Sequence, residues 1–212
     1  MTVYFISGID ASVGKTYATG FIARNMIEQG HSVITQKLVQ TGTNKAKDIE
    51  THRRIMGIDL LPEDTQGLTC PQIFPYPSDP YFSAKLANKN LDLTAIEIAT
   101  DELSRRYEVV LAETSGGILT PLTDNLLTAD YIEQRHYPLI LTTSCKENCI
   151  NQTLLALEAI KNRGIYLYAI AFNHSNDNFD PVLSAEIANY LKKQLEFKFP
   201  NAQWIGIPTV KI

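Results

Sequence analysis

Short apolar runs alternate with amphipathic stretches along most of the chain. Runs typical of β-strands cover residues 3–7, 32–36, 109–112, 139–143, 168–172 and 204–205. Helical patterns lie between them at residues 17–29, 48–56, 94–107, 124–133, 150–162 and 180–195. Continuous apolar runs such as residues 109–112 are typical of strands buried on both faces of a parallel sheet. The alternation therefore predicts an α/β fold with one doubly wound, mostly parallel sheet.

Three stretches add detail to this prediction. Residues 57–83 are rich in proline and show no clear period, so we expect an irregular segment there. Thr94 and Glu97 have the spacing of a capping box, which predicts a helix N-terminus at Thr94. Asp180 and Pro181 have the chemistry of an N-cap and a first helical position. Because no linker or low-complexity segment interrupts the pattern, we expect a single domain over residues 1–212.

The charge and cysteine content narrow the class of protein. A net charge of −4 gives no support to nucleic-acid binding driven by charge. No segment approaches the ~20 apolar residues of a membrane span, and the N-terminus lacks the pattern of a secretion signal. The three cysteines, Cys70, Cys145 and Cys149, are sparse, as is typical of a reducing compartment. We interpret Cys145 and Cys149 as small semi-buried residues rather than a metal site. We therefore expect a cytoplasmic protein with no nucleic-acid or membrane partner.

A glycine-framed turn follows the first apolar run. Gly8 and Gly14 enclose five residues, and Lys15 and Thr16 come next at the start of a helical pattern. A strand, a Gly-rich turn and a helix opening on Gly-Lys-Thr form the context of a phosphate-binding loop. In such a loop, backbone N–H groups converge on phosphate oxygens. Lys15 would then place its charge at the β- and γ-phosphates, and the Thr16 hydroxyl would ligate Mg²⁺. The common loop has four residues between these glycines, so an ordinary strand-to-helix turn is the alternative.

Further polar residues follow the other predicted strands. Lys37 ends the second strand, Glu113 ends the 109–112 strand and Asn173 ends the 168–172 strand. In open α/β sheets, ligands bind at the carboxyl ends of the strands. A Lys and a Glu beside a phosphate loop suit phosphoryl transfer, since the Lys can balance phosphoryl charge and the Glu can hold Mg²⁺. The alternatives are a solvated lysine for Lys37 and a helix-cap or salt-bridge carboxylate for Glu113.

Five short motifs occur in one order along the chain. They are Gly-Ile-Asp-Ala-Ser-Val-Gly-Lys-Thr at residues 8–16, Lys-Leu-Val-Gln-Thr-Gly at 37–42, Ala-Glu-Thr-Ser-Gly-Gly at 112–117, Asn-Cys-Ile-Asn at 148–151 and Gly-Ile-Pro at 206–208. In these motifs, and in the five-residue gap of the first one, the chain resembles the dethiobiotin synthetase family over nearly its whole length. The resemblance implies a P-loop NTPase-like topology and a homodimer.

The resemblance also implies a reaction. In that family, one amine of 7,8-diaminopelargonic acid takes up CO₂ as a carbamate. A carbamate oxygen attacks the γ-phosphate of ATP, with Mg²⁺ as the cofactor, and gives a carbamic–phosphoric anhydride. The second amine then closes the ureido ring and expels phosphate. This chemistry implies clustered positive charge, because a carbamate anion must approach a triphosphate.

Residue roles follow from the motif positions. Lys15 and Lys37 are the implied catalytic residues, and Thr16, Asp48 and Glu113 the implied Mg²⁺ ligands. The residues implied to bind the nucleotide are Gly8, Asp10, Ala11, Ser12, Val13, Gly14, Lys15, Thr16, Tyr17, Glu113, Gly116, Asn173 and Pro208. The residues implied to bind the substrate are Thr41, for the carbamate, and Cys149, Ile150, Asn151 and Gln152, for the carboxylate across a dimer interface. An alternative for Asn151 is that it merely caps its helix.

The sequence departs from the family pattern in several places. Ala11 stands where the family usually has Thr, and Ser12 replaces a frequent Glu. Residues 114–115 are Thr-Ser rather than Gly-Ala, and residues 79–81 are Asp-Pro-Tyr rather than Ser-Pro-His. Four residues follow Pro208, where the family has a further helix over the nucleotide. We therefore expect weak discrimination among ATP, CTP and GTP, with Asn173 as the chief reader of the base.

Two other functions remain open at this point. One is a nucleotide switch of the partitioning or septum-positioning type, which shares the topology. Those proteins carry a signature lysine four residues before the second loop glycine, a position occupied here by Asp10. The other is a related ligase that acts on a different amine.

Overall fold

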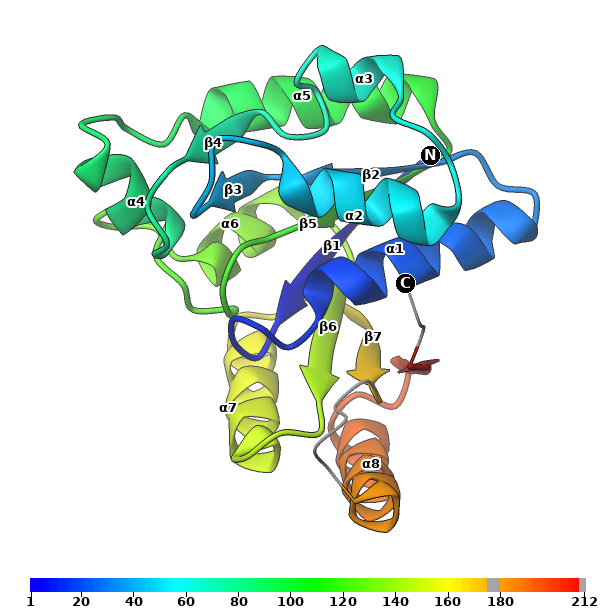
Figure 1. Cartoon of the computed structure of the whole chain (residues 1–212). Coiled ribbons are helices and arrows are strands. Elements are labelled where there is room, and N and C mark those ends of the chain that lie inside the picture. The colour runs from blue at the N-terminus through cyan, green and yellow to red at the C-terminus, as the bar shows by residue number, and fades with distance from the viewer. Residues whose placement is uncertain (175–179, 210–212) are drawn as a thin grey trace.

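The central feature of the fold is a sheet of six parallel strands. The computed structural model describes residues 1–174 and 180–209. The strand order is β2-β5-β1-β6-β7-β8, and every neighbouring pair is parallel (Figure 1). The strands are β1 (Thr2–Gly8), β2 (Val33–Lys37), β5 (Val109–Glu113), β6 (Leu139–Ser144), β7 (Leu167–Asn173) and β8 (Gln203–Ile207). The predicted parallel α/β sheet is therefore confirmed.

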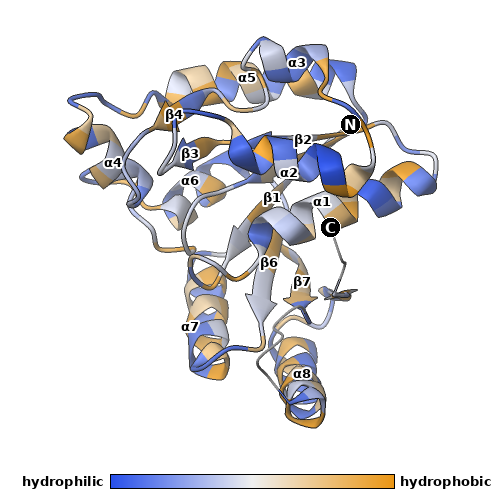
Figure 2. Ribbon diagram, in the orientation of Figure 1, coloured by the Kyte–Doolittle hydropathy of each residue, from blue (hydrophilic) through white to orange (hydrophobic). Residues whose placement is uncertain are grey.

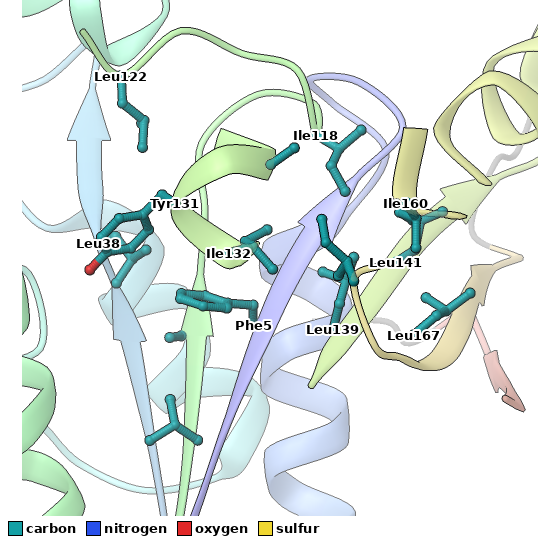
Figure 3. Close-up of a cluster of buried hydrophobic side chains, with 14 of the residues drawn as sticks. Phe5, Leu38, Ile118, Leu122, Tyr131, Ile132, Leu139, Leu141, Ile160 and Leu167 are labelled. Atoms are coloured by element: carbon teal, nitrogen blue, oxygen red, sulfur yellow. The ribbon is translucent and has the colours of Figure 1, made fainter. Parts of the chain in front are cut away.

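Helices cover both faces of this sheet. They are α1 (Lys15–Glu28), α2 (Lys47–Met56), α3 (Pro62–Thr65), α4 (Pro80–Leu86), α5 (Leu93–Arg106), α6 (Thr128–Arg135), α7 (Cys149–Asn162) and α8 (Pro181–Lys198). Successive strand residues point to opposite faces. Accordingly, Phe5 packs in one apolar cluster with α5, α6 and α7, whereas Ile6 packs in another with α1 and α2 (Figure 3). Along α7, hydrophobic and hydrophilic residues are intermixed, as expected for a helix with one buried side (Figure 2).

The prediction of an irregular segment over residues 57–83 is wrong. This segment contains α3, β4 (Gln72–Phe74) and the first part of α4. Strand β4 pairs in parallel with β3 (Val39–Thr41) to form a separate two-stranded sheet. Strands of three residues are too short to show a period in the sequence. Pro62 and Pro80 each stand at the first position of a helix, where proline has no hydrogen bond to lose.

Three predicted helix starts can be compared with the structure. The capping box at Thr94 is wrong, because Asp92 is the N-cap of α5 and its carboxylate accepts a hydrogen bond from the Ala95 N–H at 2.9 Å. Helix α6 begins at Thr128 rather than near residue 124, since residues 121–127 form a turn closed by a bridge between its two ends. The N-cap at Asp180 is confirmed, because its side chain accepts from two backbone N–H groups of α8.

The carboxyl ends of the strands meet at one edge of the sheet. Gly8 ends β1, Lys37 ends β2, Glu113 ends β5 and Asn173 ends β7. In register, Lys37 lies opposite Glu113. Across residues 1–174 and 180–209, the helices lack the combination of length and apolar character that spanning a membrane requires.

Candidate active site

The loop between β1 and α1 contains two residues with a positive φ angle, and one of them must be glycine. Ser12 has φ of 54° and Gly14 has φ of 85°, both in the left-handed region. Curled loops of this kind let successive backbone N–H groups form an anion-binding nest. The Asn173 Nδ2 atom donates to the Val13 carbonyl at 3.3 Å. A Cβ atom on Gly14 would lie 1.9 Å from this nitrogen. Only glycine fits at this position.

Lys15 begins α1 and reaches back under the loop. Its Nζ atom donates to the Asp10 carbonyl at 2.8 Å, and the residue is only 7% exposed. Burial lowers the pKa of Lys15 to about 8, assisted by the charge on Lys37 and opposed by nearby carboxylates. A buried ammonium next to a second one gains from an anionic ligand, as a phosphate group would be.

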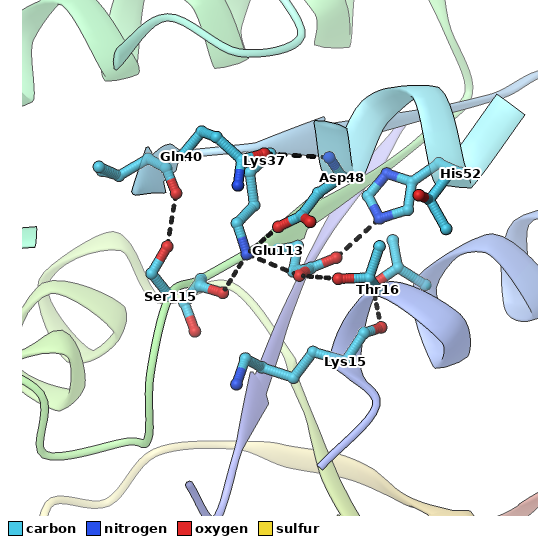
Figure 4. A network of polar contacts seen from close by, with 12 residues as sticks. Lys15, Thr16, Lys37, Gln40, Asp48, His52, Glu113 and Ser115 are labelled. Carbon is cyan, nitrogen blue, oxygen red and sulfur yellow. Dashed lines mark hydrogen bonds and ion pairs between the residues drawn. The ribbon is translucent and has the colours of Figure 1, made fainter. Parts of the chain in front are cut away.

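Lys37 is bound by two carboxylates at the same edge (Figure 4). Its Nζ atom lies 2.7 Å from Glu113 Oε1 and 2.9 Å from Asp48 Oδ2. Burial alone would lower the pKa of Lys37, but the two carboxylates raise it above its ordinary value. Burial would likewise raise the pKa of Glu113, but the charge on Lys37 and a hydrogen bond from His52 hold it well below its ordinary value. Both groups are therefore charged.

Thr16 completes this cluster. Its hydroxyl donates to Glu113 Oε1 at 2.9 Å. Asp48 comes from the first turn of α2, where its backbone N–H donates to the Gln40 side chain at 3.0 Å. Of the three predicted metal ligands, Asp48 and Glu113 therefore contact the Lys37 ammonium directly, and Thr16 contacts Glu113.

A cavity of about 320 Å³ lies over this cluster and the phosphate loop. Its lining residues are Ala11, Ser12, Gly14, Lys15, Thr16, Lys37, Gln40, Thr41, Asp48, Glu113, Ser115 and Gly116. Within the described part of the chain, no three His, Cys, Asp or Glu side chains gather as a metal cluster. Two carboxylates and a hydroxyl nevertheless fit Mg²⁺, which is usually bound by one or two carboxylates together with substrate phosphates and water.

Asp10 links the loop to the start of α7. Its Oδ2 atom lies 3.0 Å from Lys146 Nζ and 3.3 Å from Gln152 Nε2. Burial would raise the pKa of Asp10, but the hydrogen bond from Lys146 and others lower it. Asp10 and Gln152 line a second cavity, also of about 320 Å³, whose apolar part comes from Ile118, Leu155 and their neighbours.

The remaining predicted residues divide into two groups. Val13, Tyr17 and Asn173 line a third cavity, of about 260 Å³, beside the loop. The residues that line none of these three cavities are Gly8, Cys149, Ile150, Asn151 and Pro208. Cys149 is buried, and its N–H donates to the Lys146 carbonyl at 3.1 Å. The alternative that Asn151 caps α7 is wrong, because the N-cap is Asn148.

Sequence reasoning missed three residues that contact the predicted ones. Gln40 accepts from Asp48, Lys146 pairs with Asp10, and His52 binds Glu113. Lys146 lies just past the end of β6, at the same carboxyl edge, so the strand-end rule could have found it. His52 stands four residues after Asp48, which places both on one face of a helix.

Comparisons with known proteins identify the family of this chain. A family model described as an AAA domain matches residues 2–198. The chain is 43% identical over 200 residues to the ATP-dependent dethiobiotin synthetase BioD 2 of Pasteurella multocida, covering 94% of this chain and 93% of the relative. It is 49% identical over 172 residues to the protein of the same name in Haemophilus influenzae, covering 81% and 90%.

A solved structure supports the fold alone. Chloroplast FtsY from Physcomitrella patens is similar with a TM-score of 0.51 and 14% identity, over 99% of this chain and 59% of that chain. The resemblance predicted from the five motifs and the predicted P-loop fold are both confirmed. The chain belongs to the family of ATP-dependent dethiobiotin synthetases.

Proposed function

We propose that this chain is an ATP-dependent ligase that makes dethiobiotin from 7,8-diaminopelargonic acid and CO₂. A carbamate formed on one amine attacks the γ-phosphorus of ATP, the bond to the bridging oxygen breaks, and ADP leaves. The second amine attacks the carbonyl carbon of the resulting anhydride, closes the ring and releases phosphate. The observation that carries the proposal is the placement of Lys15 and Lys37 at one cavity together with Glu113 and Asp48, in a chain similar to dethiobiotin synthetases.

The reaction brings two anions together. Two unit charges ~4 Å apart at an effective dielectric constant near 20 interact by about 4 kcal/mol. Lys15 lies under the phosphate loop and Lys37 pairs with Glu113 at the same cavity, so together they would offset this repulsion between triphosphate and carbamate. Thr41 lines the same cavity, and we assign its hydroxyl to the binding of the carbamate.

Thr16, Asp48 and Glu113 would hold Mg²⁺. The fit rests on oxygen ligands that already surround a cation, since Lys37 contacts both carboxylates. When bound, the metal would neutralise charge on the β- and γ-phosphate oxygens. With the metal held by the carboxylates, the Lys37 ammonium would be available to the phosphate.

The second cavity suits the alkyl chain of the diamine. Ile118 and Leu155 give it apolar walls, and Asp10 stands at its end nearest the loop. The start of α7 would bind the substrate carboxylate in a homodimer, because helix N-termini favour anions. We also infer a cytoplasmic location, in keeping with cysteines that are few and buried.

Product analysis tests the proposed function. The protein is incubated with 7,8-diaminopelargonic acid, ATP, Mg²⁺ and ¹³C-bicarbonate, and the products are identified by mass spectrometry. We expect dethiobiotin that carries one ¹³C atom, with one ADP formed per ring. ATP hydrolysis without ring formation would favour the nucleotide-switch class instead. A labelled product only with a different amine would favour the other ligase class.

A further inference from the structure

His52 is a fully buried side chain in contact with the candidate metal site. It belongs to α2 and is 0% exposed. Its Nε2 atom lies 2.7 Å from Glu113 Oε2, and its Nδ1 atom lies 3.1 Å from the Thr35 hydroxyl (Figure 4). The reaction proposed above gives this side chain no role.

The surroundings of His52 fix which ring nitrogen carries the proton. Glu113 forms an ion pair with Lys37 at 2.7 Å, and a carboxylate can only accept hydrogen bonds. A bare Nε2 atom would therefore place two acceptors 2.7 Å apart. On the other side, Thr35 Oγ1 already accepts from Arg53 Nη1 at 2.8 Å, and its own proton can point at Nδ1. These contacts thus connect Arg53 through Thr35 and His52 to Glu113.

Arg53, at the other end of this series of contacts, is itself held in place. Arg53 is 2% exposed, and its guanidinium binds both oxygens of Asp64, at 2.9 Å from Nε and 2.8 Å from Nη2. A bidentate pair of this kind leaves the guanidinium little freedom. The arginine therefore holds the hydroxyl of Thr35, and through it the imidazole ring, in one orientation.

The two oxygens of Glu113 are consequently not equivalent. Oε2 is occupied by His52, whereas Oε1 accepts from Thr16 and Lys37, which line the nucleotide cavity. Asp48 and His52 stand four residues apart on α2. One face of this helix therefore carries the Asp48 carboxylate and also the His52 ring that orients the Glu113 carboxylate.

We propose that His52 is a positioning residue for the metal-bound nucleotide: it anchors Glu113 Oε2 and so directs Oε1 toward Mg²⁺. The proposal rests on the function proposed above, in that it takes Glu113 as a metal ligand. It predicts that His52 matters for the binding of MgATP and not for the binding of ATP without metal, whose phosphates contact the loop and Lys15.

Two amide substitutions separate anchoring from packing. In His52→Gln an N–H donor reaches the place of Nε2, whereas in His52→Asn the amide reaches only the place of Nδ1. ATP binding is measured by calorimetry, first in EDTA and then over a series of Mg²⁺ concentrations. Loss of a hydrogen bond to a metal-ligating group typically costs about 10–100-fold in metal affinity. We expect the Mg²⁺ concentration for half-maximal effect to rise by about that factor in the Asn variant and by less than about threefold in the Gln variant.

In EDTA, both variants should bind ATP as the unchanged protein does. The proposal is overturned if the Asn variant keeps the original Mg²⁺ dependence, or if ATP binding in EDTA falls as much as binding with Mg²⁺. If the Asn variant does not fold, Thr35→Val and Thr35→Ser decide, since only the serine keeps the hydroxyl that orients the ring. Equal Mg²⁺ dependence in that pair overturns the proposal. Because these measurements need no diamine, absence of dethiobiotin in the product assay would refute the proposed function alone.

Discussion

Replacement of Lys37 by alanine should nearly abolish turnover. The lysine is 4% exposed and contacts two carboxylates, Glu113 at 2.7 Å and Asp48 at 2.9 Å. The substitution removes the positive charge that would face the γ-phosphate and carbamate in the reaction. It also removes the ammonium that pairs directly with both carboxylates in the ligand-free protein.

Two effects of different size follow from this geometry. At 2.7 Å and an effective dielectric constant near 20, the attraction between Lys37 and Glu113 is about 6 kcal/mol. Desolvation offsets much of this, and removal of one partner of a buried pair typically costs about 3–5 kcal/mol of stability. For the reaction, loss of one group that stabilises developing charge typically lowers kcat by about 10²–10³-fold.

The assay must separate the loss of stability from the loss of kcat. Urea unfolding gives the free energy of unfolding, and kcat is then measured at a temperature where the variant is fully folded, with saturating MgATP, bicarbonate and diamine. Lys198→Ala is the matched control. Lys198 also pairs with a glutamate, Glu158, but it lies on the surface of α8, and the residues that line the cavity are distant from it in the sequence. We expect the control to keep full activity. If folded Lys37→Ala retains more than about half of the kcat, far above the expected 10²–10³-fold loss, the placement of Lys37 in the reaction is wrong.

Three further outcomes follow from particular contacts. Gly14→Ala should weaken ATP binding, measured by calorimetry, at least about tenfold, because the added Cβ would meet Asn173. Gly30→Ala is the control. It introduces the same left-handed strain but has open space around the added Cβ, so this variant should bind ATP normally. Burial would raise the pKa of Asp64, but hydrogen bonds from Arg53 lower it, so its contribution to stability is complete above the unfolded pKa of ~3.9 and is lost as the pH falls. Asp64→Asn should therefore reduce the free energy of unfolding by about 3 kcal/mol at pH 7, and urea titrations should show this difference shrinking below about pH 4. Sedimentation should show a dimer when the enzyme is active, and a fully active monomer at micromolar concentration would contradict the homodimer.

The strand ends were predictable because they depend on local signals. The apolar run before Glu113 identifies a buried strand, and parallel strands place their carboxyl ends at one edge. Lys37 and Glu113 could therefore be assigned to one site although 76 residues separate them along the chain. The phosphate loop was predictable for the same reason, since Gly14 and Lys15 stand between a strand and a helix.

The parts that sequence reasoning missed depend on contacts between distant segments. Strands β3 and β4 have three residues each and are stabilised by pairing with one another, so neither carries a pattern of its own. A lone histidine in a helix is more often a core residue than part of a site. That His52 meets Glu113, 61 residues away, depends on how α2 packs against the sheet.

The charges of the cluster bear on which form of the nucleotide it accepts. In the ligand-free protein, the ammonium groups of Lys15 and Lys37 stand against the carboxylates of Asp48 and Glu113, two charges of each sign. ATP without metal would bring further negative charge beside both carboxylates, and Lys37 would have to leave them to reach the phosphate. A divalent cation that arrives with the nucleotide would be held by the carboxylates of Asp48 and Glu113, and Lys37 would then be available to the γ-phosphate. We therefore expect MgATP to bind more tightly than ATP without metal, with Lys37 beside the place where the carbamate would attack.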